Sequence, residues 1–343
     1  MTNLTEQLLD AFGADSASAE LARDYGLDTF CGLSGGQRRR QVLLTQAVLR
    51  GALQGIDATF GDDVPYLLLK GQPLQEILFD GRYLRPTGDV DILVLPGDIG
   101  AARRRLKQLG YRPKRDEPPR MWVHNQEPFY HRENGVIVEL HWSVAEPQMP
   151  QPPIGELFET GVAFELDDNL TVDVLRDDWL FFQLVLHFHH HMGFAKGLLD
   201  IAAWCDRFGA ECDEQELLDR ARQMGMFGMV QWPLHTLEQL TGQRPPLFDD
   251  SADRFVRIFA RRCAAAMRDC LVAPPGSDLE ASLVAIMPTL SPTRGVALRA
   301  ATMAVVDGGG WEKLRAVMRP IFEGPHFLGR ALQRWRFGPP RRW

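Results

Sequence analysis

Cysteine is scarce in this sequence, and its arrangement excludes several kinds of site. The five cysteines among 343 residues are odd in number and form no Cys-x-x-Cys pair. A disulfide framework needs cysteines in pairs, and structural zinc sites are commonly built on closely spaced pairs. We therefore expect reduced thiols in a cytoplasmic protein.

Long apolar runs are also missing. The longest stretch without Lys, Arg, Asp or Glu covers residues 179–195 and holds four histidines, so it falls short of a membrane span. Residues 1–15 contain acids and lack the basic and apolar regions of a signal peptide. These absences predict a soluble, cytoplasmic protein that has no membrane partner.

An excess of positive charge is absent as well. The chain has 38 Lys and Arg against 45 Asp and Glu, which gives a net charge of −7 and argues against a generic nucleic-acid binder. Residues 311–343 are the exception, with eight basic residues and two acids. This basic C-terminus is either a solvated tail or a surface for a phosphate or an acidic partner, nucleic acid included.

The chain contains no GxxxxGK[ST] phosphate loop. Residues 33–37 read Leu-Ser-Gly-Gly-Gln and match the signature peptide of ABC-transporter ATPases, but such an ATPase needs the phosphate loop upstream. Ser34 is instead a reasonable N-cap for a helix that begins near Gln37. The sequence therefore argues against an ABC-type role.

The hydrophobic period divides the chain into three parts. Residues 1–60 have helical spacing, residues 61–175 contain short β-branched runs, and residues 176–343 return to helical spacing. This pattern predicts an α/β (α+β) protein in which a mixed-sheet domain follows an N-terminal helical segment and precedes a helical C-terminal domain.

Within the middle part, the pattern predicts strands and helices at definite positions. The expected strands cover residues 66–70, 89–95, 121–131, 136–142 and 170–175, the expected helices residues 73–79 and 98–109, and a loop residues 112–120. Asp98 is expected to cap its helix, and the strands at residues 121–131 and 136–142 are expected to form a hairpin around Glu133-Asn134-Gly135. In the last part, helices are expected at residues 177–191, 198–208, 214–224, 230–240, 252–270, 296–306 and 311–322.

Carboxylates gather on two of these strands. Asp89 and Asp91 lie one residue apart at the start of a strand, so their side chains point to the same face. Charges this close repel unless a cation lies between them, although a solvated face is the simpler alternative. Glu139 and His141 share one face of the later strand, which adds a third carboxylate.

Taken in chain order, three motifs resemble a known superfamily. They are Leu69-Lys70-Gly71, the run Asp89-Val90-Asp91-Ile92-Leu93-Val94 after Arg85, and Glu139-Leu140-His141-Trp142. This order is similar to that of the DNA polymerase beta-like nucleotidyltransferase superfamily, and more narrowly to the group described as uncharacterised nucleotidyltransferases. In that group His-x-x-x-His precedes Asp-Ile, as His187 and His191 precede Asp200-Ile201 here.

The resemblance implies a mixed-sheet catalytic core at residues 61–175 and a site that binds two Mg²⁺ ions. Asp89, Asp91 and Glu139 would be the catalytic and metal-binding residues, and Lys70, Gly71, Arg85, His187 and His191 would bind a nucleoside triphosphate, most often ATP. Two features depart from the superfamily pattern: Gln72 replaces the usual Ser after the glycine, and Glu139 replaces the usual Asp.

The implied reaction is transfer of a nucleoside monophosphate, AMP above all, to a hydroxyl of a small molecule, a sugar or a peptide. Two divalent ions would activate that hydroxyl and hold the triphosphate. Members that resemble this group occur near natural-product and polysaccharide pathways. The alternatives are phosphoryl transfer to a peptide at the same metal site, and a non-catalytic nucleotide-binding or toxin–antitoxin module.

The histidine cluster allows three interpretations. His187 and His191 are four residues apart on one helix face, which is compatible with zinc, but no third ligand is apparent. The cluster either lines a cleft that binds nucleotide or acceptor, forms a buried hydrogen-bonded group, or ligates a metal. His141 either orients Glu139 or the acceptor, or packs beside Trp142.

Overall fold

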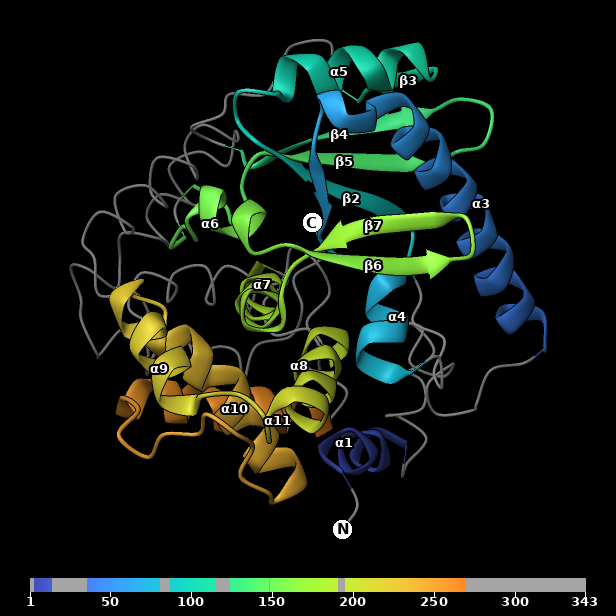
Figure 1. The fold of residues 1–343 in the computed structure, drawn as a ribbon. Coiled ribbons are helices and arrows are strands. Elements are labelled where there is room, and N and C mark those ends of the chain that lie inside the picture. Colours follow the sequence, from blue (N-terminus) through green and yellow to red (C-terminus); the bar gives the residue numbers. More distant parts are fainter. Residues whose placement is uncertain are drawn as a thin grey trace, which may run out of the picture.

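The computed structural model describes residues 3–13, 36–80, 87–114, 124–147, 149–190 and 195–268. Within these residues, seven strands form one mixed sheet in the spatial order β3-β4-β5-β2-β1-β7-β6 (Figure 1). The strands are β1 (Tyr66–Leu68), β2 (Asp89–Val94), β3 (Tyr111–Pro113), β4 (Gln126–His131), β5 (Ile137–His141), β6 (Val162–Asp167) and β7 (Leu170–Val174). The predicted mixed α/β class is confirmed.

The register of the central strands fixes which side chains are neighbours. Strand β2 runs parallel to β5 and antiparallel to β1, while β1 runs parallel to β7. Strands β4 and β5 form the predicted antiparallel hairpin, and Gly135 in its turn has a φ of 71°, which glycine adopts readily. Because Asp91 pairs with Glu139, their side chains leave the same face of the sheet.

The two faces of the sheet pack against different helices. Val90, Ile92 and Val94 of β2 face one apolar cluster, together with α3 (Gly36–Phe60) and α5 (Ile99–Gln108). Leu93 faces the other cluster with α4 (Gln72–Phe79) and α7 (Asp177–His190). Figure 1 shows α5 above the sheet and α7 below it. Since side chains alternate along a strand, the β2 carboxylates point toward α7.

A group of helices covers the α7 side of the sheet. It comprises α7, α8 (Ala195–Phe208), α9 (Glu214–Gln223), α10 (Phe227–Thr241) and α11 (Arg254–Arg268), and we call it the helical half. Helix α1 (Leu4–Gly13) packs against it, because Leu4 and Thr5 donate backbone N–H bonds of 2.8 Å to the Asp206 carboxylate. The N-terminal helix is thus fixed to the helical half, whereas α3 lies on the sheet.

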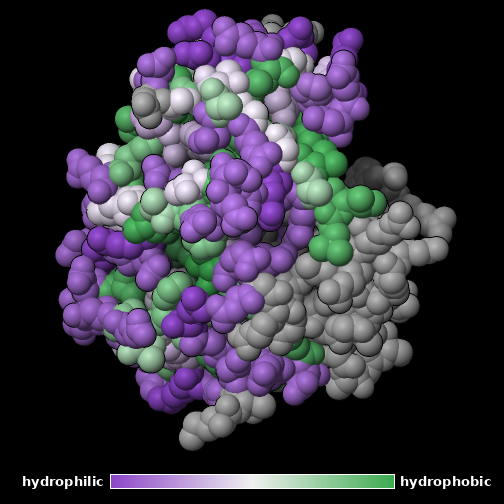
Figure 2. Space-filling view, turned by 45° about the vertical axis from the view of Figure 1, so that its right-hand side comes forward, coloured by the Kyte–Doolittle hydropathy of each residue, from purple (hydrophilic) through white to green (hydrophobic). Residues whose placement is uncertain are grey.

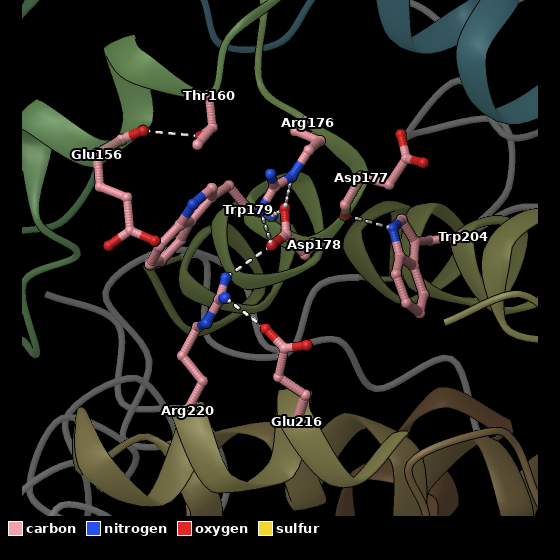
Figure 3. A network of polar contacts seen from close by, with 9 residues as sticks. All are labelled: Glu156, Thr160, Arg176, Asp177, Asp178, Trp179, Trp204, Glu216 and Arg220. Carbon is pink, nitrogen blue, oxygen red and sulfur yellow. Dashed lines mark hydrogen bonds and ion pairs between the residues drawn. The ribbon is translucent and has the colours of Figure 1, made fainter. Parts of the chain in front are cut away.

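Helix α7 is apolar on all sides, which is typical of a helix buried in a core. Its first turn is held by ion pairs (Figure 3). Asp178 accepts hydrogen bonds of 2.6 Å from Arg176 and from Arg220 of α9, and the Arg220 guanidinium lies 4.8 Å from the centre of the Trp179 ring. These contacts join the first turn of α7 to α9.

Most predicted elements agree with the structure, and three details differ. Asp98 does not cap α5 through its side chain, because its φ of −96° and ψ of −4° are already helical rather than extended. The predicted loop at residues 112–120 begins inside β3, whose Pro113 is tolerated because β3 is an edge strand. The short helix α6 (Ile154–Glu159) and strand β6 were not predicted. The helices expected at 296–306 and 311–322 lie outside the described residues.

The two halves of α3 differ in exposure. Its second half is buried against the sheet through Leu49, Leu53 and other apolar residues. Its first half carries Leu43 and Leu44, which are 46% and 58% exposed. Figure 2 turns this side of the molecule forward, and apolar side chains gather there beside polar ones. In the described part of the chain, no helix has both the length and the apolar content to cross a membrane.

Candidate functional site

The predicted carboxylates come together where β2 and β5 run side by side. Asp91 and Glu139 are paired residues of the parallel ladder, and Asp89 lies two residues before Asp91 on the same face. One ligand atom from each of Asp91, Glu139 and His141 lies within 4.8 Å of the other two. Asp89 is not part of that close group, but it lines the same cavity. Strand pairing therefore gathers side chains that are 50 residues apart in the chain.

Asp91 is the most buried carboxylate of this group, at 1% exposure. Its Oδ1 atom lies 2.8 Å from Lys70 Nζ and 3.1 Å from His141 Nε2, whereas its Oδ2 atom is buried without a hydrogen-bond partner. Burial by itself favours the neutral acid, but Lys70 and His141 hold the pKa of Asp91 well below its usual range. Asp91 is therefore ionised, with one oxygen unused.

Asp89 has the opposite environment. Burial, followed by repulsion from Asp91, raises its pKa to about 6, although Lys70 and Lys196 oppose the shift. A divalent cation beside Asp89 would relieve this repulsion and favour its ionised form. The adjacent carboxylates thus have the electrostatics that a bound cation stabilises.

Lys70 follows β1 at the predicted turn. Although burial lowers the pKa of its ammonium, the charges of Asp91, Asp89 and Glu139 raise it overall, so Lys70 is a fixed cation facing three acids. Gly71 has a φ of 84° and precedes the first residue of α4. A Cβ atom there would come within 3.7 Å of the Asp89 carbonyl oxygen, which places the turn directly beside the start of β2.

His141 contacts both acids of the close group. Its Nε2 atom lies 3.1 Å from Asp91 Oδ1 and 3.6 Å from Glu139 Oε2. Since an ionised carboxylate can only accept, Nε2 carries the hydrogen and donates it to Asp91. Burial lowers the pKa of His141, but the bonds to Asp91 and Glu139 outweigh it and raise the pKa. Of the roles considered from the sequence, contact with Glu139 is observed, and Asp91 is a further partner.

These residues fit a divalent cation. The unused Asp91 Oδ2 atom and the neighbouring Glu139 carboxylate supply the oxygen ligands that Mg²⁺ and Mn²⁺ prefer. The carboxylates project from paired strands rather than loops, so the site is held by the sheet itself.

A cavity of about 130 Å³ opens beside the carboxylates and extends to the helical half. Its polar lining includes Lys70, Asp89, Asn125, Gln126, Glu139, His141, Glu146, Gln183 and His187. Val144, Met149 and Leu186 supply apolar walls. The sheet thus contributes the charged side of the cavity, and α7 contributes the opposite side.

The histidines of α7 have different surroundings. His187 lines the cavity, whereas His189 is fully buried and donates a 2.9 Å hydrogen bond to the Met229 carbonyl oxygen. Burial lowers the pKa of His189 to about 4, which identifies it as a neutral core residue. His191 lies outside the described residues, as does Arg85, so their predicted nucleotide contacts stay predictions.

Sequence reasoning missed Asn125, Gln183 and Lys196. Gln183 had a signal, because it is the one polar residue in the run Leu180-Phe181-Phe182-Gln183-Leu184-Val185-Leu186. Asn125 precedes a strand, and no sequence signal indicated its role. Lys196 lies in the first turn of α8 and acts electrostatically on Asp89 across the fold, which no local pattern could indicate.

Comparison with known proteins gives one finding. A family model described as "uncharacterised nucleotidyltransferase" matches residues 36–242, which include the whole sheet and the helices from α3 to α10. No curated protein matches the chain.

Proposed function

This chain belongs to the family of uncharacterised nucleotidyltransferases, and we propose that it is a Mg²⁺-dependent enzyme that transfers a nucleoside monophosphate, AMP above all, from a nucleoside triphosphate to a hydroxyl. The observation that carries this proposal is the register that places Glu139 opposite Asp91, with Lys70 and His141 both bonded to Asp91 Oδ1.

In the proposed reaction, the acceptor oxygen attacks the α-phosphorus and forms a new P–O bond. The bond between the α-phosphorus and the bridging oxygen breaks, and pyrophosphate leaves. Glu139 is half-buried beside Asp91 and takes the proton that the acceptor hydroxyl loses. When bound, two divalent ions supply charge neutralisation for the attacking and leaving oxygens.

The chain's own residues have distinct roles in this proposal. Asp89, Asp91 and Glu139 would hold the cations, and Asp91 offers its unpartnered Oδ2 atom for this purpose. His141 positions Asp91 through its hydrogen bond to Oδ1. Lys70 and the backbone N–H groups near Gly71 would bind the triphosphate, since fixed cations stabilise charge that develops on phosphate oxygens. His187 lines the cavity and would contact nucleotide or acceptor.

The test is product analysis with each nucleoside triphosphate and Mg²⁺ against a panel of sugars, small alcohols and peptides. Mass spectrometry should find an acceptor enlarged by a nucleoside monophosphate, together with pyrophosphate. An acceptor that gains a single phosphoryl group would instead support the kinase-like alternative. The double variant Asp89→Ala, Asp91→Ala should abolish either reaction while the chain stays folded, and activity that persists in this variant would refute the site.

A further inference from the structure

The cavity beside the carboxylates is small. Its volume of about 130 Å³ is below the roughly 300–1,000 Å³ of ordinary ligand pockets. We therefore expect this space to receive one end of a ligand, such as the hydroxyl-bearing end of an acceptor, while the rest of the ligand lies outside it.

Asn125 lines this cavity and has an unused hydrogen-bond acceptor. The residue is 7% exposed, and its Nδ2 atom donates to the Ser143 carbonyl oxygen at 3.4 Å. This bond fixes the orientation of the amide, because the reversed amide would place two oxygens against each other. Its Oδ1 atom is buried and has no hydrogen-bond partner.

Gln183 of α7 has a second unused hydrogen-bond acceptor. It is 4% exposed, lies among buried apolar residues, lines the cavity, and its Oε1 atom has no hydrogen-bond partner. Gln231 of α10 is a buried glutamine with a structural role, and it serves as a comparison. Its Nε2 atom donates to the Leu247 carbonyl oxygen at 2.8 Å, and its Oε1 atom accepts from the Asp249 N–H at 2.9 Å. Gln183 lacks such bonds although it is almost as buried.

We propose that Asn125 and Gln183 form the acceptor subsite of the enzyme and bind two hydroxyl groups that neighbour the reacting hydroxyl. The inference rests on the proposed function, whose acceptor it specifies. Both amide oxygens accept hydrogen bonds, and a ligand hydroxyl can donate one to each. Asp89 and Glu139 line the same cavity and, in the metal-free chain, repel anions. The acceptor is thus an uncharged polyhydroxylated molecule, a sugar or sugar alcohol, rather than an acidic peptide end.

Ligand binding without nucleotide tests the subsite independently of turnover. Saturation-transfer NMR on the full chain would use glucitol as the probe and gluconate as its anionic match, with glycerol and 1-propanol as a second pair. We expect glucitol and glycerol to bind. Gluconate should bind at least about tenfold more weakly than glucitol because the carboxylates repel its charge. 1-Propanol should bind at least about tenfold more weakly than glycerol, because a site built for hydroxyl donors rejects analogues that lack them. Failure of glucitol and glycerol to bind the wild-type chain would overturn the proposal.

The variant Gln183→Leu separates this role from a structural one, with Gln231→Leu as the matched control. We expect Gln183→Leu to weaken glucitol binding about tenfold while its melting temperature stays equal to or above that of the wild type, because it removes an unsatisfied buried group. Gln231→Leu should lower the melting temperature and leave glucitol affinity unchanged. Unaltered glucitol affinity in Gln183→Leu, or a melting temperature as low as that of the control, would refute the subsite.

The same measurements separate failure of the subsite from failure of the proposed function. Nucleotide transfer that depends on Asp91, together with unaltered glucitol binding in Gln183→Leu, would leave the transferase standing and refute the subsite. Glucitol binding that is lost in Gln183→Leu, without turnover of any nucleoside triphosphate, would support the subsite and refute the transferase.

Discussion

Gln231 and His189 in the helical half differ from three buried polar side chains beside the cavity. In the helical half, Gln231 uses both ends of its amide, and His189 donates to a backbone carbonyl. Beside the cavity, Asp91 Oδ2, Asn125 Oδ1 and Gln183 Oε1 are buried without a partner. The exposed fractions of these residues are similarly small, so burial alone does not distinguish a structural polar group from a functional one.

The difference is energetic. An unsatisfied buried acceptor costs about 1–3 kcal/mol, whereas a satisfied neutral hydrogen bond contributes about 0.5–1.5 kcal/mol to stability. The cavity region therefore keeps groups in a state that a ligand would improve, and the helical half offsets this through hydrogen bonds such as those of Gln231 and through apolar packing. If so, changes at the cavity should affect function first, and changes in the helical half should affect stability first.

The largest expected effect is the loss of activity in Asp91→Asn. The substitution keeps the shape of the side chain but removes the charge that would bind a cation, so we expect transfer to fall at least about a thousandfold, equivalent to about 4 kcal/mol in the barrier. Steady-state kinetics would measure this, while circular dichroism should show an unchanged helix content. A variant that is unfolded, or one with near-normal rates, would contradict the division between the two regions.

His189 in the helical half should make the free energy of unfolding depend on pH. Its pKa is about 4 in the folded chain and an ordinary 6.5 in the unfolded chain. Above pH 6.5 it is neutral in both states. As the pH falls from 6.5 to 4, only the unfolded state gains the proton, so stability is lost across that window by about 3 kcal/mol.

Urea unfolding at several pH values checks the His189 prediction, with His189→Gln as the comparison. This variant should lose the part of the pH dependence between 6.5 and 4, because glutamine does not titrate. An identical pH dependence in both proteins would mean that His189 is not a neutral core residue.

The ion pairs at the first turn of α7 should contribute less to the free energy of unfolding than the titration of His189 does. Asp178→Ala removes the bonds to Arg176 and Arg220 that Figure 3 displays. Because the Asp178 side chain is only 19% exposed, we expect a loss of about 1–2 kcal/mol in the free energy of unfolding. The matched control is Asp219→Ala on the exposed surface of α9, where the pair with Arg222 is solvated and the melting temperature should not change. Equal melting temperatures for the two variants would contradict this ranking.

The smallest expected effect on stability is that of Gly71→Ala. Its φ of 84° strains any other residue, so we expect a loss of about 1 kcal/mol. Transfer should fall as well, because the turn positions Lys70 beside the carboxylates. Gly97→Ala is the control, since nothing lies near its Cβ position and its φ is not in the left-handed region. Similar melting temperatures and rates in both variants would show that the turn tolerates a side chain.

Much of the fold could be predicted because its signals are local. The β-branched run at residues 136–138, followed by the alternation of Glu139 and His141 with Leu140, indicated a strand, and Glu133-Asn134-Gly135 indicated its hairpin. Strand β6 was not predicted because most of its residues are exposed or half-buried. It therefore has no apolar face that alternates with a polar one. The predicted cap at Asp98 was wrong because the side chain of a capping residue acts from an extended backbone, and the backbone of Asp98 is helical.

The sequence by itself determined the chemistry: which acids, which lysine and glycine, and their order along the chain, all of which are properties of single residues and short motifs. The tertiary structure alone decided the arrangement. Strand pairing placed Glu139 opposite Asp91, burial left Asp91 Oδ2 without a partner, and the packing of α7 brought Gln183 to the cavity. These facts depend on contacts between segments far apart in the chain, and no local pattern encodes whether a buried group will find a partner.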